Sequence, residues 1–506
     1  MYLIVFFSSN FIYSTLLYNK FFYKEKKPIQ IKNQNKEDIS NLKLLIGYDE
    51  NEKQDIILPE SGLYQNFLIT GTIGSGKTSS AMYPFTNQLL KYNAINSQNK
   101  ISMLILDVKG NYYEQVKKYV EKYNLNEDLI VIELNSNIKY NPLDKPNLKP
   151  TVLANRLRTI LELFSENNSE SYWLDKAEQV LQESIKLCRI YNNGYVTFQE
   201  IHKLITIDGY YKEKISIIKD MFLNSELNQE QVFELNSALE FFQKEFTNLD
   251  SRTLAILKSE ITRITNTFVS DYSVLKTFCP KKEELTFKGF GEVIEKGKIV
   301  VLNMNIAEYK NLSKIIATYL KLDFQTEVLS RLSNPKTIRQ SAFICDEYHE
   351  YATITDADFL SQSREAKCIN IIATQSYSSI KNALKDTDSS KVLLQNIINK
   401  LWFRTDDIFT IEEIQKQIGK EDKTRISTTI SENSKETKFN LFTNSLMSTN
   451  SGISESYNKY TQNDYIYDTN FFTQFLETFQ CLAFILNGLK IEKPRKIQMI
   501  PYYEKK

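Results

Sequence analysis

The sequence has few of the residues from which metal centres and disulfide frameworks are built. Its 506 residues include five cysteines and two histidines, and no two cysteines form a C-x-x-C pair. An odd number of scattered cysteines is typical of a protein kept in a reducing compartment, and it argues against a zinc site. Isolated histidines are more often packed or exposed side chains than ligands, so neither His202 nor His349 is expected to bind a metal.

The chain also lacks an excess of charge of one sign. There are 63 basic and 62 acidic residues, which gives a net charge of +1. No global basic field therefore points to nucleic acid, and any contact with DNA must come from local patches or from a ring of subunits. Hydrophobic residues make up 42% of the chain and charged residues 25%, as in globular proteins. At this length we expect about two to four domains.

The amino terminus contains an uncharged stretch. Residues 2–18 carry no charged side chain, and four lysines follow at positions 20, 24, 26 and 27. A single membrane span needs roughly 17–25 mostly apolar residues, and the lysines are expected on the cytoplasmic side. We therefore expect residues 1–23 to form a single-pass transmembrane anchor, with the bulk of the chain in the cytoplasm. An interfacial or buried helix is the alternative.

Alternating strand-like and helix-like stretches predict an α/β fold with a mostly parallel sheet. Residues 24–60 are polar and are interpreted as a linker with a first strand near 42–46. Continuous apolar runs indicate strands buried on both faces. These runs lie at 65–70, 101–106, 128–134, 297–304, 341–345, 368–374, 400–403 and 481–487.

Between these strands, residues 150–285 carry apolar side chains at helical spacing. The sequence therefore predicts an all-helical domain inserted into a nucleotide-binding domain whose two parts span 61–149 and 286–506. Within the second part, residues 421–464 are rich in Ser, Thr and Asn and are predicted to form a long polar hairpin or a mobile loop. A helix is expected over 469–479.

Three of the chain's 14 glycines fall in the stretch GTIGSGKTSS, residues 71–80. This stretch fits G-x-x-x-x-G-K-[ST], in which glycines let backbone N–H groups curl around an anion and the next helix directs its positive dipole end there. We expect the loop to bind ATP, with Lys77 on the β/γ-phosphates, Thr78 on Mg²⁺ and Ser79 on the α/β-phosphate oxygens. The predicted nucleotide contacts are Gly71, Thr72, Gly74, Ser75, Gly76, Lys77, Thr78 and Ser79.

A second set of polar side chains follows strands further along the chain. Asp346 and Glu347 end an apolar run and would supply a second Mg²⁺ anchor and a water-activating carboxylate. Gln375 ends the next strand, at the edge where ligands of open α/β sheets bind, and would sense the γ-phosphate or position water. Arg364 and Arg404 are candidates for an arginine finger. The alternatives are an acidic pair that merely ends a strand, a solvated glutamine and surface arginines.

Together these stretches resemble the conjugative coupling proteins of type IV secretion systems, the TraG/TraD-type DNA-transfer ATPases related to the FtsK/HerA motors. They follow the family's order from about residue 60 to 410. The stretches are GTIGSGKTSS (71–80), LILDVKGNYY (104–113), KYNPLD (139–144), SYWLDKAEQVL (171–181), GKIVVLNM (297–304), FICDEYHE (343–350), SQSREAKCINIIATQS (361–376) and LLQNIINKLWFRTDD (393–407).

The resemblance implies a RecA-like motor domain, an inserted all-helical domain, an inner-membrane anchor and homo-hexamers around DNA. It implies an ATPase that uses ATP and Mg²⁺ and couples hydrolysis to the transfer of a DNA–relaxase substrate to a secretion channel. Arg364 becomes the better arginine-finger candidate, because it matches the family's arginine before the Ala-Thr-Gln strand. The residues that would keep the roles given above are Lys77, Thr78, Asp346, Glu347 and Gln375.

Two other functions remain open at this point. One is a DNA translocase of the same motor class that is not tied to a secretion channel. The other is a nucleotide-gated adaptor that recruits protein cargo through residues 150–285.

Overall fold

The computed structural model describes residues 42–165, 171–224, 227–334, 338–432, 439–440, 445–446, 453–487 and 490–503. The predicted anchor, residues 1–23, lies outside these ranges. Across the ranges that are described, no helix combines the length and apolar character needed to cross a membrane.

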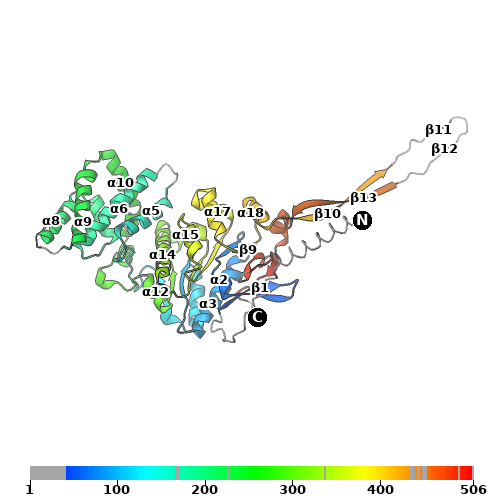
Figure 1. The fold of residues 1–506 in the computed structure, drawn as a ribbon, viewed down its shortest axis with the longest axis horizontal. Coiled ribbons are helices and arrows are strands. Elements are labelled where there is room, and N and C mark those ends of the chain that lie inside the picture. Colours follow the sequence, from blue (N-terminus) through cyan, green and yellow to red (C-terminus); the bar gives the residue numbers. More distant parts are fainter. Residues whose placement is uncertain are drawn as a thin grey trace, which may run out of the picture. The chain divides into compact units, whose positions relative to one another are not determined.

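One large sheet organises the described chain (Figure 1). It has 11 strands in the order β2-β1-β17-β14-β9-β3-β8-β7-β4-β6-β5. Strands β9 to β5 in this order pair in parallel, whereas β14, β17, β1 and β2 are added antiparallel beyond β9. The mostly parallel sheet is therefore confirmed. The strands are β1 Lys43–Asp49, β2 Gln54–Pro59, β3 Phe67–Thr70, β4 Ser102–Leu106, β5 Leu129–Ile132, β6 Ile299–Leu302, β7 Ser341–Cys345, β8 Cys368–Thr374, β9 Asn399–Phe403, β14 Gln480–Phe484 and β17 Arg495–Gln498.

The central strands are apolar throughout because both faces of the sheet are covered. In β4, Met103 and Ile105 belong to the core beneath helices α3 (Tyr83–Ile95) and α4 (Tyr112–Lys122). Leu104 and Leu106 point the other way, into the core formed with α12 (Phe290–Lys296) and α14 (Asn311–Ser330). The period-2 alternation of a strand thus divides one continuous apolar run between two cores.

The antiparallel edge differs from the sequence prediction. Residues 24–60 are predicted to be a linker with one strand, but β1 and β2 form an antiparallel pair there. Strand β17 has no clear sequence signal, because only Ile497 among its four residues is buried. Short polar edge strands lack the periodicity that identifies longer ones, and β17 forms because β14 and β1 pair with it on either side.

The helix expected over 469–479 is mostly absent. Only η10 (Phe471–Phe475) forms, as a single π-helical turn. The chain then turns toward the glycine loop, where the N–H of Phe479 donates to the carbonyl of Ser75 at 3.1 Å. A tertiary hydrogen bond therefore overrides the helical pattern of this stretch.

The helix after the glycine loop begins irregularly. Its first turn, η1 (Thr78–Met82), is π-helical and continues directly into α3. Pro84 has no N–H to bond the carbonyl of Ser80, so the α-helical hydrogen-bond pattern cannot run unbroken through this turn.

From Pro150 to Phe278 the described residues are predominantly helical and pack into the core that also covers one face of the sheet. The apolar positions that recur at helical spacing are largely buried, among them Val180 and Ile185 in α6 and Ile261 in α10. The predicted domain boundaries around this region stay predictions. The helices are α5 Pro150–Glu162, α6 Ser171–Tyr191, α7 Phe198–Thr206, α8 Tyr210–Leu223, α9 Gln229–Glu240, α10 Ser251–Val269 and α11 Tyr272–Phe278.

The polar stretch near the carboxyl terminus contains a two-stranded ribbon (Figure 1). Strand β10 (Lys420–Glu432) pairs antiparallel with β13 (Ile453–Tyr465) along its whole length, from Lys420 opposite Tyr465 to Glu432 opposite Ile453. Residues 420–432 and 453–465 are therefore paired as in the hairpin alternative.

A buried cluster of charges joins the helical region to α14. The carboxylate of Asp323 in α14 accepts from Lys145 Nζ at 2.6 Å and from Arg156 Nη1, on α5, at 3.0 Å. Burial raises the pKa of Asp323, but the two cations outweigh it and hold that pKa below its ordinary value. All three side chains are largely buried, so removing one partner leaves an uncompensated buried charge.

We expect Asp323→Asn to lower the free energy of unfolding by about 3–5 kcal/mol at pH 7, measured by urea denaturation. The contribution of Asp323 is present above its unfolded pKa of about 3.9 and is lost as the pH falls through its lower folded pKa. The difference between the two proteins should therefore shrink in acid. Glu295→Gln, on the exposed face of α12, is the control and should change stability by less than about 0.5 kcal/mol. Equal stability of Asp323→Asn and the unaltered chain at pH 7 would contradict this role.

Candidate active site

The glycine loop follows β3 and adopts a conformation that depends on its glycines. Gly74 and Gly76 have φ of +79° and +99°, which favours glycine. A Cβ on Gly71 would lie 2.6 Å from the Cβ of Phe403, and one on Gly76 would lie 2.5 Å from the ring of Phe479. No atom of the described residues lies within 4 Å of the position a Cβ would take on Gly74. The loop is therefore tightly packed at both ends and open in the middle.

Neighbouring segments hold the loop in place through its backbone. Thr72 donates from its N–H and its hydroxyl to the carbonyl of Arg404, at 2.9 and 3.2 Å. The hydroxyl of Ser75 donates to the carbonyl of Thr72 at 2.8 Å. The loop is thus tied to the end of β9, the strand beside β3.

Lys77 folds back over the loop that precedes it. Its Nζ donates to the carbonyls of Gly71 at 2.5 Å and Thr72 at 3.1 Å. Burial lowers the pKa of Lys77, while Glu347 and Asp346 oppose this shift. A cation held by backbone carbonyls in a poorly solvated place is well prepared to meet an anion.

The two predicted metal ligands touch, although they are 268 residues apart in the chain. The hydroxyl of Thr78 donates to Asp346 Oδ2 at 2.8 Å, and the N–H of Glu347 donates to Asp346 Oδ1 at 3.0 Å. Burial raises the pKa of Asp346, the hydrogen bond from Thr78 lowers it, and the nearby carboxylate of Asp107 raises it further. A bound cation would offset the free-energy cost of burying this carboxylate in its charged form.

Glu347 occupies an unusual backbone conformation for a residue other than glycine. Its φ and ψ are +49° and +46°, in the left-handed region, which costs of order 1–3 kcal/mol and often marks functional sites. Its Oε1 lies 3.4 Å from Lys109 Nζ. Its Oε2 is buried and accepts no hydrogen bond among the described residues. An unsatisfied carboxylate oxygen is suited to accept a proton from a water molecule.

A buried ion pair anchors the segment that follows Glu347. Lys321 on α14 donates to Asp356 Oδ2 at 2.6 Å, to the carbonyl of Tyr351 at 2.6 Å and to the hydroxyl of Thr353 at 3.0 Å. Lys321 and Asp356 are both almost completely buried. These contacts anchor the segment from Tyr351 to Asp356, which follows Glu347 in the chain.

Gln375 follows β8, which lies between β3 and β7 in the sheet. Thr374 is paired in register with Thr70, the residue before Gly71. Gln375 therefore stands at the level of the glycine loop, on the strand between the loop and the acidic pair. It is partly exposed.

The two arginines lie at opposite ends of the parallel strands, Arg404 at the carboxyl ends and Arg364 at the amino ends. Arg404 directly follows β9, so it is at the same edge as the glycine loop. Arg364 precedes β8 and is exposed. With the Gln65 amide oriented to accept, Arg364 donates to it from Nε at 3.2 Å and from Nη1 at 3.3 Å. Gln65 precedes β3 and the glycine loop follows it. Arg364 therefore lies at the opposite end of the strands from the glycine loop of its own chain.

Two side chains that sequence reasoning did not assign to the site lie next to Glu347. One is Lys109, in the Asp-x-Lys-Gly stretch after β4. The other is His349, whose Nδ1 lies 3.8 Å from Glu347 Oε2 and 3.2 Å from the hydroxyl of Thr374. Burial lowers the pKa of His349, although Glu347 and Glu350 oppose the shift. An isolated histidine has no spacing signal, so only the fold reveals this contact.

The donor set at this edge fits magnesium bound to a nucleotide. Magnesium is usually held by one or two protein oxygens together with phosphate oxygens and water, and Thr78 and Asp346 supply such a pair. No group of three or more His, Cys, Asp or Glu side chains in the described residues is arranged to hold a metal alone. A magnesium ion held by Thr78 and Asp346 would therefore take its remaining ligands from phosphate oxygens and water.

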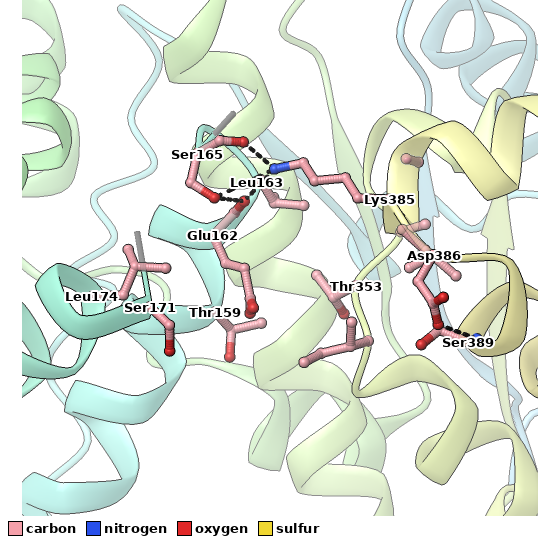
Figure 2. A pocket seen from close by; sticks show the side chains of 14 residues that line it. Thr159, Glu162, Leu163, Ser165, Ser171, Leu174, Thr353, Lys385, Asp386 and Ser389 are labelled. Carbon is pink, nitrogen blue, oxygen red and sulfur yellow. Dashed lines mark hydrogen bonds between the residues drawn. The ribbon is translucent and has the colours of Figure 1, made fainter. Parts of the chain in front are cut away.

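A separate cavity of about 430 Å³ lies between helices α5 and α6 and helices α16 (Tyr377–Leu384) and α17 (Thr387–Gln395). Figure 2 shows Lys385 reaching across it to the carbonyls of Glu162 and Ser165. None of the predicted nucleotide contacts lines this cavity. Thr353 does line it, so one wall of the cavity belongs to the segment that Lys321 anchors.

We expect Gly76→Ala to destabilise the protein more than Gly74→Ala, by about 1–3 kcal/mol, because only the first methyl group meets the ring of Phe479. Both positions have positive φ, so the backbone cost is shared and the difference isolates the packing clash. Urea denaturation of the two variants measures it. Equal stabilities would mean that Phe479 does not pack against the loop in solution.

This chain is similar to known proteins both in part of its sequence and in its fold. Residues 340–466 match a family model described as the TraM recognition site of TraD and TraG. No curated protein matches the chain by sequence. The bacterial conjugative coupling protein TrwBdeltaN70, in its unbound form, is similar in structure with a TM-score of 0.55 and 12% identity, covering 88% of this chain and 87% of that one.

Two further solved structures are similar. TrwB in complex with ADP and Mg²⁺ has a TM-score of 0.54 and 12% identity, with coverage of 88% and 87%. VirB4 of Thermoanaerobacter pseudethanolicus has a TM-score of 0.51 and 14% identity, and the match covers 92% of this chain and 98% of that one. The resemblance seen in the sequence is therefore confirmed at the level of the fold: the chain is built like the conjugative coupling protein TrwB, and its residues 340–466 match the TraD and TraG recognition region.

Proposed function

We propose that the chain is a membrane-anchored ATPase that couples ATP hydrolysis to the transfer of a DNA–relaxase substrate to a type IV secretion channel. The observation that carries the proposal is the contact between Thr78 and Asp346, which joins the glycine loop to the acidic pair at one edge of the sheet. The fold shared with a conjugative coupling protein, and with the same protein holding ADP and Mg²⁺, supports the choice of ligand and of process.

In this proposal the chain's own residues divide the chemistry as follows. Lys77 binds the β/γ-phosphates, and Thr78 and Asp346 hold Mg²⁺, which neutralises phosphate charge when bound. Glu347 takes the proton of the attacking water through its unsatisfied Oε2. Gln375 orients that water from the neighbouring strand.

The proposal extends to a RecA-like domain in two parts, an inserted helical domain at 150–285 and an anchor at 1–23. It also includes the homo-hexamer that the resemblance to the coupling proteins implies, in which Arg364 would act between subunits. Arg364 is exposed at the edge far from its own glycine loop, so the site it completes belongs to an adjacent copy. Arg404, already beside the loop of its own chain, would act in cis.

We expect the purified full-length chain to hydrolyse ATP in the presence of Mg²⁺, and DNA to stimulate this activity. Lys77→Ala should abolish nucleotide binding and turnover. Glu347→Gln should lower kcat by about 10²–10⁴-fold while ATP still binds, because the carboxamide cannot accept the proton. Phosphate release and calorimetry measure the two effects, with Glu295→Gln as the control.

The outcomes of that experiment separate the candidate functions. ATP hydrolysis that ignores every DNA would contradict the transfer motor and favour the nucleotide-gated adaptor. Loss of conjugal transfer on deletion with normal growth supports the secretion role, whereas a segregation defect would favour a translocase without a channel.

We expect Arg364→Ala to reduce kcat by about 10³–10⁵-fold, as for other arginine fingers. Mixing Arg364→Ala with Lys77→Ala should restore part of the activity, because the intact Arg364 of the second variant completes the intact glycine loop of the first. Glu365→Gln, at the adjacent exposed position, is the matched control and should keep its activity. No recovery in the mixture would contradict action between subunits.

A further inference from the structure

Three aromatic side chains from the end of the chain gather beside the glycine loop. The rings of Tyr502 and Tyr503 have centroids 5.3 Å apart, and those of Phe479 and Tyr503 are 6.3 Å apart. Tyr502 is 45% exposed and Tyr503 is 59% exposed. We call these three residues the aromatic cluster. Two adjacent exposed tyrosine rings offer flat faces on which a planar ligand can stack.

Backbone hydrogen bonds attach the aromatic cluster to the loop. The N–H of Phe479 donates to the carbonyl of Ser75 at 3.1 Å, and the N–H of Tyr502 donates to the carbonyl of Ser79 at 2.9 Å. The N–H of Met499 donates to the carbonyl of Phe479 at 2.7 Å and so joins the segment before Tyr502 to Phe479. The positions of the rings relative to the loop are therefore set by main-chain bonds.

Phe479 holds a strained conformation to reach this place. Its φ is +66°, which is a genuine outlier for a bulky side chain. Its ring occupies the space that the missing side chain of Gly76 leaves open. Strain of this kind persists where surrounding contacts enforce it, and it often marks a ligand site.

Tyr502 is supported from the helix that begins in the loop. Its ring meets the ring of Tyr83 edge to face, with centroids 5.2 Å apart. Tyr83 lies about one helical turn after Ser79. Tyr502 therefore contacts the helix close to Ser79, both through its backbone and through its ring. Ser79 is the residue expected to bind the α/β-phosphate oxygens.

We propose that the aromatic cluster is the site for the base of the bound nucleotide. The inference rests on the proposed function, because it takes the glycine loop as the phosphate site. The base is joined through the ribose to the α-phosphate, and the aromatic cluster adjoins the end of the loop where that phosphate is expected. Stacking on aromatic faces tolerates every base, since each has a π-face. The site therefore takes nucleoside triphosphates with little preference among the bases.

The test compares ligands with and without a base. Binding of ATP, GTP and inorganic tripolyphosphate to the full-length chain is measured by calorimetry with Mg²⁺. The variant is the double substitution Tyr502→Ala with Tyr503→Ala. We expect its affinity for ATP and GTP to fall by about 10-fold, while tripolyphosphate binds as before. Unchanged tripolyphosphate binding also demonstrates that the variant is folded.

Two further variants sharpen the result. Tyr502→Phe with Tyr503→Phe keeps the rings and should keep the affinity for ATP, which distinguishes stacking from hydrogen bonding by the phenols. Tyr272→Ala removes an exposed tyrosine from α11, away from the loop, and should change nothing.

Three outcomes would overturn the inference, and they can be told apart. Unchanged ATP affinity in the double alanine variant means that the rings do not contact the base and instead face another copy or a protein partner. Equal weakening of ATP and tripolyphosphate means that the aromatic cluster supports the loop rather than binding a base. Failure of the unaltered chain to bind either ligand would remove the proposed function itself.

Discussion

The hydrogen bond from Thr78 to Asp346 is the contact on which the rest of the site depends. It spans 268 residues of sequence, and it forms because parallel strands deliver their carboxyl ends to one edge. The order β3-β8-β7 fixes the spacing, with the glycine loop on one side, the acidic pair on the other and Gln375 between them. A slip of one strand in this order would separate the hydroxyl from the carboxylate and remove the metal pair.

Burial penalises charges both inside and outside the site, but their partners differ. Asp323 and Lys321 are buried charges with several close partners, and each holds elements together. At the site, burial raises the pKa of Asp346 and lowers that of Lys77, and one oxygen of Glu347 receives no hydrogen bond from the part of the chain that the structure describes. Charges left partly uncompensated in a poorly solvated place interact strongly with an incoming charged ligand.

The carboxyl-terminal segment completes the site from the far end of the chain. Strands β14 and β17 extend the sheet antiparallel beyond β9, and this extension brings Phe479 and Tyr502 back to the loop formed some 400 residues earlier. The strained backbone of Phe479, in the carboxyl-terminal part of the chain, and that of Glu347, directly after β7, thus both belong to the surroundings of the glycine loop. Both are positions at which the surrounding contacts override the local preference.

By itself, the sequence determined the parallel strands and the chemistry of the glycine loop, because long apolar runs and the G-x-x-x-x-G-K-T pattern are local signals. It also indicated Asp346, Glu347 and Gln375, since each ends such a run. Only the tertiary structure decided that Arg364 lies away from its own loop, that His349 adjoins Glu347 and that Phe479 leaves a helical pattern to pack on Gly76. These outcomes depend on strand order and on hydrogen bonds between distant segments, and no periodicity or short motif records such contacts.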